Sequence, residues 1–212
     1  SNATWIPNGV DLAAFRRTLP EDVHAFREKY GLTERFSIGY IGNHGWWSGM
    51  DLLLAAFKQV RVQVPKSRLV IIGPGEELPR YQAQLAGDPD VVFTGPVAPE
   101  QVAACFQGVD LGVLPFEICP FTDNALPLKI LEYGAARKRV LATPLKELQT
   151  LAFPHVSLLP PEPPLWATAM AREALSPTPW VPAWDAAITA YDWPTVLHGL
   201  CDLLEERDAV IV

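Results

Sequence analysis

The sequence predicts an α/β fold, a Rossmann-like open parallel sheet with helices on both faces and helical additions at the C-terminal end. Strand-like and helix-like segments alternate along most of the chain, as they do in sheets built from β-α-β units. The strand-like segments, such as residues 68–73, are continuous apolar runs rather than alternating ones. Such runs are typical of parallel strands that helices bury on both sides.

The expected elements follow one another in a regular order. The expected strands are residues 36–42, 68–73, 90–94, 110–115 and 139–143, and the expected helices are 20–30, 50–62, 76–86, 99–107, 127–136, 145–151, 165–175 and 194–206. Gly31 stands just after the first helix and Pro127 at the start of a later one, the usual places for these residues. Helix 50–62 carries one apolar stripe at helical spacing. After residue 154 the alternation of strand-like and helix-like segments is less regular, and prolines are frequent.

Composition excludes several classes of protein. Hydrophobic residues make up 49% of the 212 residues and charged residues 19%, which suffices for a buried core and excludes disorder. The net charge of −7 disfavours a nucleic-acid partner. The three cysteines lack a Cys-x-x-Cys pair and the four histidines lack ligand spacing, so we expect neither a disulfide scaffold nor a metal site. Free thiols fit a reducing, cytoplasmic location.

Four loops follow the carboxyl ends of the expected strands, where open parallel sheets bind ligands. They are residues 42–49, 73–75, 95–98 and 116–127, and three of them carry glycine where a strand gives way to a helix. Backbone N–H groups and positive helix ends at such turns suit phosphate. None is a Gly-x-Gly-x-x-Gly or Walker loop, so the usual NAD and ATP fingerprints are absent. A tight turn without ligand would explain any one glycine, whereas several at one edge favour a site.

The helix expected at 127–136 should bury one stripe and present polar side chains on another face. The stripe is Leu128, Leu131 and Ala135, and the other face holds Lys129, Glu132 and Tyr133. The lysine could face a diphosphate, and the carboxylate could accept hydrogen bonds from sugar hydroxyls. The alternative is a surface salt bridge between Lys129 and Glu132, which spacing alone favours.

Together these motifs resemble the C-terminal domain of retaining glycosyltransferases of the GT-B fold, family 4. The matching segments are Ile6-Pro7-Asn8-Gly9-Val10-Asp11 followed by Phe15, Tyr40-Ile41-Gly42 with its loop and helix, 69–75, Val92-Phe93-Thr94-Gly95, 110–115, 127–133, 140–143 and Tyr191-Asp192-Trp193. They cover nearly the whole chain in order. Ser1-Asn2-Ala3 resembles an expression-tag remnant and is left out of the fold prediction. The resemblance implies three further parts: an interdomain crossover at 4–16, a Rossmann-like donor-binding domain at 17–190, and a C-terminal helix at 191–212 that packs back towards an N-terminal domain.

The resemblance also implies roles for particular residues. Glu132 matches the family's ribose-binding glutamate, and Asn124 stands in place of the glutamate that contacts the donor sugar. Asn43 and Ser48 stand where the family has a phosphate-binding arginine and lysine. The candidate catalytic residues are therefore Lys129, Glu132 and Asn124, and the candidate donor-binding residues are Gly42, Asn43, His44, Gly45, Ser48, Gly73, Gly75, Gly95, Val97, Asp123, Ala125 and Leu126. Lys129, His44 and the backbone near Leu126 are the candidates to replace the lost cations, and the nucleobase is expected near 95–97.

The implied partner is a UDP- or GDP-sugar, used with retention and without a metal or other cofactor. The sugar or lipid-linked acceptor would bind the N-terminal domain, so we expect this chain alone to bind donor and transfer little. Arg137-Lys138-Arg139 suggests peripheral contact at the inner membrane face, with a solvated turn as the alternative.

Trp46 and Trp47 could cover a donor or pack under another domain, and ordinary packing is the alternative. Two other functional classes stay open: a non-catalytic nucleotide-sugar or interaction domain on the same scaffold, and a flavodoxin-like signalling domain. The second would need clustered acids after the first strand, where residues 42–45 supply none.

Overall fold

Six parallel strands form one sheet in a computed structural model that describes residues 6–209, with side chains described to residue 201. The order across the sheet is β3-β2-β1-β4-β5-β6. The strands are β1 Phe36–Ile41, β2 Ser67–Ile72, β3 Val91–Gly95, β4 Leu111–Leu114, β5 Arg139–Ala142 and β6 Val156–Leu158. Every strand pair in the sheet is parallel, which confirms the predicted Rossmann-like class.

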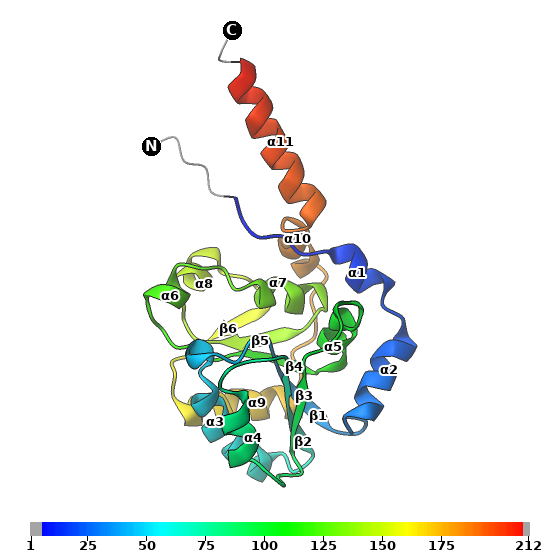
Figure 1. Cartoon of the computed structure of the whole chain (residues 1–212), viewed down its shortest axis with the longest axis vertical. Helices are drawn as coiled ribbons and strands as arrows, with labels where there is room; N and C mark the ends of the chain where they lie inside the picture. The colour runs from blue at the N-terminus through cyan, green and yellow to red at the C-terminus, as the bar shows by residue number, and fades with distance from the viewer. Residues whose placement is uncertain (1–5, 210–212) are drawn as a thin grey trace.

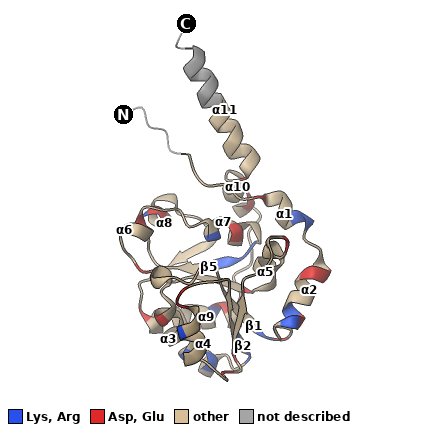
Figure 2. Cartoon of the chain, viewed as in Figure 1, with Lys and Arg blue, Asp and Glu red and all other residues tan. Residues whose placement is uncertain are grey.

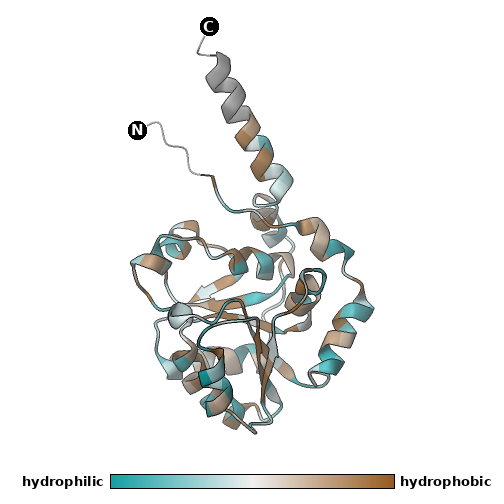
Figure 3. Cartoon of the chain, in the orientation of Figure 1, coloured by the Kyte–Doolittle hydropathy of each residue, from teal (hydrophilic) through white to brown (hydrophobic). Residues whose placement is uncertain are grey.

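Helices cover both faces of the sheet (Figure 1). They are α1 Leu12–Arg17, α2 Pro20–Lys29, η1 Trp46–Ser48, α3 Met50–Gln63, α4 Leu78–Gln84, η2 Pro99–Gln101, α5 Val102–Gly108, α6 Pro120–Asp123, α7 Leu128–Ala135, α8 Lys146–Leu151, α9 Pro163–Leu175, α10 Trp184–Thr189 and α11 Trp193–Ala209. One core joins the sheet to α3, α4 and α9, and the other joins it to α1, α2, α5, α7 and α8. Figure 3 shows the apolar strands enclosed between these layers.

Strand β2 shows why its sequence is a continuous apolar run. Leu69 and Ile71 enter one core, while Val70 and Ile72 enter the other, and all four side chains are fully buried. Successive side chains of a strand point to opposite faces, so a strand covered on both sides needs apolar residues at every position. Each such side chain contributes about 1.5–3 kcal/mol by leaving water.

The segment before α1 lies beside the segment that leads into α11. Val10 donates its backbone N–H to Tyr191 (2.8 Å) and accepts one from Trp193 (3.1 Å). The carboxylate of Asp192 accepts a hydrogen bond from the backbone of Leu12 at 3.2 Å. From this junction α11 projects away from the sheet (Figure 1). No helix in the described part of the chain combines the length and apolar character needed to cross a membrane.

Five short elements were not predicted: β6, α1, η1, α6 and α10. Strand β6 has three residues, and α6 and α10 have four and six, so each is too short for hydrophobic periodicity to reveal it. The predicted helix 76–86 is shorter in the structure, because α4 begins at Leu78 after a turn. Charged side chains lie mostly on the helices and loops around the sheet, and α7 carries a basic and an acidic position side by side (Figure 2).

The loops after β1 and β4 touch through their backbones at Gly49. This residue has φ +63°, and a Cβ there would overlap the carbonyl oxygen of Pro115. Gly87 also has a positive φ, +80°, but a Cβ at that position would meet open space. The two glycines therefore separate the effect of steric overlap from that of backbone strain.

We predict that Gly49→Ala lowers the free energy of unfolding by about 2–4 kcal/mol, because strain of the left-handed backbone adds to the overlap. Gly87→Ala, the matched control, should lose about 1 kcal/mol from strain alone. Urea denaturation of both variants measures the difference. Equal losses would show that the contact between the two loops does not constrain the fold.

Candidate functional site

The candidate site lies where the order of the strands reverses. From β1 the chain builds the sheet outwards through β2 and β3, and it then returns to place β4 on the other side of β1. Open α/β sheets bind ligands at such a switch point, outside the carboxyl ends of the strands. The loops that meet there are residues 42–49 and 115–127, and α7 begins at the end of the second loop.

Helix α7 carries a half-buried ion pair into this site. Lys129 Nζ lies 2.7 Å from Glu132 Oε2, and the two side chains are 28% and 13% exposed. A Cβ added at Gly42 would lie 3.6 Å from Lys129 Cε, so the lysine runs along the loop after β1. Its Nζ also lies 5.5 Å from the ring centroid of Phe106. The predicted salt bridge is confirmed, and it lies against the glycine loop rather than in open solvent.

The predicted faces of α7 are partly wrong. Tyr133, placed by the spacing beside Lys129 and Glu132, is fully buried and donates its hydroxyl to the carbonyl of Gly39 at 2.6 Å. Burial raises the pKa of this tyrosine well above its usual value. Leu128, expected in the stripe, is 38% exposed, and Ile130 is buried instead. A large ring gains by burial once a strand carbonyl satisfies its hydroxyl, and this sets the rotation of the helix.

Several backbone N–H groups of the glycine loops are engaged by backbone carbonyls of the fold. The amide of Gly42 donates to Ile72 (2.9 Å), His44 to Pro74 (2.9 Å), Gly73 to Gly95 (3.0 Å) and Ser48 to Gly45 (3.0 Å). Gly73 has φ +116°, and a Cβ there would overlap the carbonyl oxygen of Gly42. A Cβ at Gly75 would overlap the backbone of His44. These glycines let neighbouring loops pack backbone against backbone.

His44 is not a cation for phosphate. Its side chain is fully buried, with the ring centroid 4.9 Å from that of Tyr40. Burial lowers its pKa to about 4, and the nearby backbone of Gly73 and Ile72 offsets only part of this shift. Neither ring nitrogen makes a hydrogen bond of normal geometry within the described residues. The ring is therefore neutral at pH 7 and hidden from a ligand.

The two positions that replace the expected cations differ in exposure. Ser48 is 1% exposed, so its hydroxyl is closed to a ligand, whereas Asn43 is exposed. The carbonyl of Asn43 accepts a hydrogen bond from the hydroxyl of Tyr40 at 3.0 Å, which holds the loop. The loop after β1 therefore brings no side-chain cation to the site, and Lys129 of α7 lies along it instead.

The loop before α7 combines engaged side chains with free backbone donors. Asn124 Nδ2 donates to the carbonyl of Pro120 at 2.7 Å, which leaves its Oδ1 free. Asp123 Oδ1 accepts the backbone N–H of Lys146 at 3.0 Å, so this predicted donor-binding side chain joins α6 to the start of α8. Within the described residues, the backbone N–H groups of Ala125, Leu126, Leu128 and Lys129 have no protein partner. The first amides of a helix are such donors, and the helix dipole favours an anion beside them.

Glu132 lines a cavity of about 250 Å³ beside this helix end. Leu128 and Glu132 of α7 line it on one side, and Val10, Asp11 and Trp193 help to close it. Four residues after β3 also line it: Pro99, Glu100, Val102 and Ala103. Val97, expected at the nucleobase, lines a separate cavity of about 390 Å³ between α2 and α5. Gly95 has φ +68° with open space beside it. Glu132 thus shares a cavity with Pro99 and Glu100, which follow β3. Val97 lines the other cavity and does not share one with Glu132.

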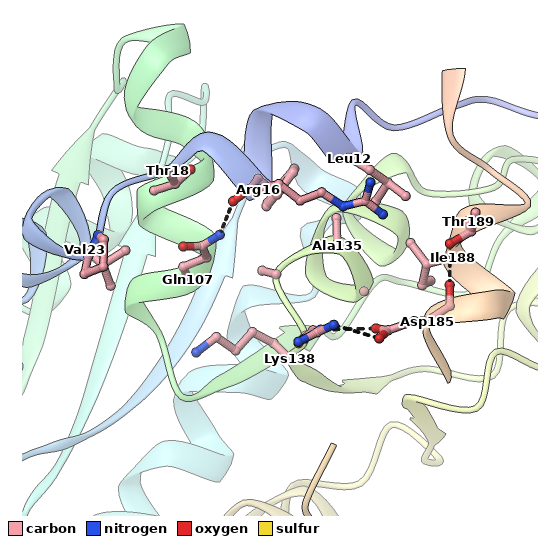
Figure 4. A pocket seen from close by; sticks show the side chains of 15 residues that line it. Leu12, Arg16, Thr18, Val23, Gln107, Ala135, Lys138, Asp185, Ile188 and Thr189 are labelled. Atoms are coloured by element: carbon pink, nitrogen blue, oxygen red, sulfur yellow. Dashed lines mark hydrogen bonds and ion pairs between the residues drawn. The ribbon is translucent and has the colours of Figure 1, made fainter. Parts of the chain in front are cut away.

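A larger cavity, of about 610 Å³, contains none of the predicted site residues (Figure 4). It lies between α1, α5, the end of α7 and α10, and Arg137 donates to Asp185 at 3.1 and 2.7 Å beside it. The guanidinium of Arg139 lies 5.2 Å from the ring centroid of Trp184 and donates to the carbonyl of Pro154 at 2.9 Å. Burial lowers the pKa of Lys138. The basic cluster 137–139 is thus largely engaged in the fold, which favours the turn alternative over a membrane-facing patch.

The fold is a Rossmann-like domain of the GT-B type. The family model described as glycosyl transferases group 1 matches residues 35–173, and the chain belongs to this family. Its sequence is 29% identical over 124 residues to the putative teichuronic acid biosynthesis glycosyltransferase TuaH of Bacillus subtilis (strain 168), covering 58% of this chain and 30% of that protein.

Another curated relative and two solved structures are similar to this chain in sequence or in fold. A GDP-mannose-dependent alpha-(1-6)-phosphatidylinositol monomannoside mannosyltransferase of Mycolicibacterium smegmatis is 31% identical over 113 residues, 52% of this chain and 29% of that protein. The structure of Anabaena HepE in complex with UDP and glucose superimposes with a TM-score of 0.77 at 20% identity, covering 94% of this chain and 56% of HepE. WaaG, involved in lipopolysaccharide biosynthesis, gives 0.67 at 17% identity, covering 88% and 50%. The chain therefore spans only part of the proteins it resembles.

The two buried histidines predict how stability depends on pH. Burial lowers the pKa of His44 and of His155 from 6.5 to about 4. As the pH falls below 6.5 the unfolded chain takes up these protons before the folded chain does. The contribution of these histidines to the free energy of unfolding should therefore be fully present above pH 6.5. Between pH 6.5 and pH 4 the free energy of unfolding should fall by about 1.4 kcal/mol per pH unit for each histidine.

Urea denaturation at a series of pH values measures this dependence. His44→Phe keeps an aromatic ring and should reduce the slope by the share of one histidine, whereas His24→Gln on the exposed face of α2 should leave it unchanged. A slope that His44→Phe does not alter would mean that His44 accepts a proton in the folded protein.

Proposed function

We propose that this chain is the donor-binding part of a glycosyltransferase that transfers a sugar from a nucleoside-diphosphate sugar with retention at the anomeric carbon. The observation that carries the proposal is the position of Glu132, half-buried on the wall of a 250 Å³ cavity, one turn from the free amides that begin α7. A carboxylate and an anion-binding helix end at this spacing match the two polar parts of a nucleoside diphosphate. Membership of the group 1 family supports the same conclusion.

The ribose hydroxyls would donate to Glu132 in this arrangement. The diphosphate would accept hydrogen bonds from the first amides of α7, where the helix dipole adds favourable charge. Lys129 Nζ, now 2.7 Å from Glu132, would lie between the carboxylate and the phosphates and interact with both. Charge-assisted bonds of this kind are about twice as strong as neutral ones.

Lys129 also supports the chemical step in this proposal. When the bond from the anomeric carbon to the diphosphate breaks, negative charge builds on the departing phosphate oxygen. Donors that are already oriented stabilise that charge without rearranging, and removing one typically costs about 3–4 kcal/mol in the barrier. The loop after β1 supplies no side-chain cation, so Lys129 and the α7 amides carry this task. We propose that no metal is required; within the described residues no three His, Cys, Asp or Glu side chains cluster as metal ligands.

Both UDP- and GDP-sugars are candidate donors. The Mycolicibacterium smegmatis relative is named as GDP-mannose-dependent, and HepE structures hold UDP, UDP-glucose, or UDP with glucose. The acceptor, a sugar or a lipid-linked sugar, would bind elsewhere on the complete enzyme. Because the chain covers only 56% of HepE, we propose that it binds donor by itself and transfers little.

We predict that Lys129→Ala weakens nucleoside-diphosphate binding about tenfold or more, because a charge-assisted hydrogen bond contributes about 1.5–3 kcal/mol. Glu132→Gln should weaken binding of the nucleoside diphosphate, because it removes the charged acceptor of the ribose hydroxyls. It should not weaken binding of inorganic diphosphate, because Lys129 and the α7 amides remain and a nearby negative charge is lost. Isothermal titration with UDP and GDP measures both effects, with Lys58→Ala on the exposed face of α3 as the matched control. Unchanged affinity in both variants would refute the site.

A second prediction concerns metal. Titration of UDP or GDP in the presence of excess EDTA should give the same affinity as titration in Mg²⁺, because backbone amides and Lys129 neutralise the diphosphate. A dependence on Mg²⁺ that EDTA abolishes would show that the phosphates need a cation which this chain does not supply.

The main alternative is a non-catalytic nucleotide-sugar domain on the same scaffold. The observation that favours it is the pair Asn43 and Ser48, where the family carries phosphate-binding cations. The two functions differ in the complete protein, where the catalytic one predicts sugar transfer that Lys129→Ala abolishes. Donor binding without transfer by the complete protein would favour the alternative.

A further inference from the structure

Three aromatic rings from two loops meet at the rim of the candidate site. Trp46 and Trp47 lie in η1 after β1, and Phe121 lies in α6 after β4. The ring centroids are 5.8 Å apart for Trp46 and Trp47, 6.2 Å for Trp46 and Phe121, and 5.3 Å for Trp47 and Phe121. Trp46 is 59% exposed and Phe121 61%. We name these three residues the aromatic cluster.

The fold holds the aromatic cluster in place. The indole of Trp47 packs over Gly45, where a Cβ would overlap the ring, and the carbonyl of Trp47 accepts the backbone N–H of Glu117 at 2.9 Å. At the start of α6 the hydroxyl of Thr122 donates to the carbonyl of Glu117 and accepts the backbone N–H of Cys119 at 3.1 Å. The exposed rings of Trp46 and Phe121 therefore stand on an ordered backbone, which lowers the entropic cost of binding a ligand.

The aromatic cluster shares a wall with the proposed diphosphate site. Trp47, Phe121 and Phe116 line a cavity of about 190 Å³, and its remaining lining residues are Thr122, Ala125 and Pro127. Ala125 contributes one of the free backbone amides, and Pro127 directly precedes α7. A group bonded to a diphosphate at this helix end would thus lie next to the rings.

The chemistry of the surroundings favours a ligand with one apolar face and a polar edge. A pyranose ring has such a shape, because its axial C–H bonds form an apolar face that stacks on indole while its hydroxyls point outwards. Polar side chains border the aromatic cluster: Asn124, whose Oδ1 is free, and Glu117, which is exposed. Both are exposed and can accept hydrogen bonds from the hydroxyls of a stacked sugar, which an acyl chain does not carry.

We infer that the aromatic cluster is a carbohydrate-binding platform, which stacks its exposed rings on a pyranose beside the diphosphate site. The inference rests on the proposed function, and it names the part of that site that recognises sugar rather than nucleotide. The pyranose is either the sugar of the donor or a sugar of the acceptor, and the two sources differ in whether the ring is bonded to the nucleotide.

The experiment compares wild type, Trp46→Leu and Trp46→Phe in two arms. The first arm measures the affinity for UDP-glucose and GDP-mannose relative to UDP and GDP. The second arm uses saturation-transfer NMR to detect contact between aromatic protons and the ring C–H protons of methyl α-glucoside and methyl α-mannoside, with and without UDP or GDP. Leu175→Ala, a 71% exposed apolar position at the end of α9, is the control, and circular dichroism verifies that each variant folds.

A donor-sugar platform predicts that Trp46→Leu lowers sugar-nucleotide affinity by about three- to tenfold, while UDP and GDP affinities stay unchanged. An acceptor platform predicts saturation transfer to the methyl glycosides that Trp46→Leu abolishes. In either case Trp46→Phe should retain most of the effect. If Trp46→Leu changes neither the affinity for sugar nucleotides nor the saturation transfer to the glycosides, the inference is overturned. If the wild-type protein binds neither UDP nor GDP, the proposed function is refuted instead. The measurements with methyl glycosides in the absence of nucleotide would still test the aromatic cluster.

Discussion

The close packing of backbone against backbone at the carboxyl ends of β1, β2 and β4 is the constraint on which the site depends. Gly49 lies against Pro115, Gly73 against Gly42, and Gly75 against the backbone of His44. Side chains at these glycines would hold the loops apart. Because the loops are so close, several of their amides donate to backbone carbonyls of the same or a neighbouring loop. The proposed anion site is therefore at the start of α7, where helix geometry leaves amides without partners.

The same packing decides which charges remain at the site. It buries His44 and Ser48, so neither can substitute for a missing cation. Lys129 reaches the loop from α7 and is held by Glu132 at 2.7 Å, so one ion pair supplies both the positive and the negative charge of the proposed donor site. The pair is half-buried, where charge interactions are screened less than at an exposed surface. The neighbouring loops bring Trp46, Trp47 and Phe121 together, and in our proposal these rings recognise sugar while the ion pair and the α7 amides recognise the nucleotide.

Much of the fold could be predicted from local patterns. The continuous apolar runs of β1, β2 and β4 and the stripe of α3 follow directly from burial on two faces, and the structure confirms them. The spacing of Lys129 and Glu132 predicted their ion pair. Tyr133 was placed wrongly because helical spacing does not reveal that the carbonyl of Gly39 is available to satisfy a buried hydroxyl. Asp123 was assigned to the donor, although its carboxylate bonds to α8, a contact that spans 23 residues.

By itself the sequence determined the class of sheet, the edge at which a ligand would bind and the helix that carries Lys129 and Glu132, because these depend on periodicity and chain order. Only the tertiary structure decided which N–H groups are free, that His44 is buried and neutral, and that Trp46, Trp47 and Phe121 come together. Those properties arise from contacts between loops that are far apart in the chain. Their geometry depends on how closely neighbouring backbones approach, and no local pattern of residues encodes that distance.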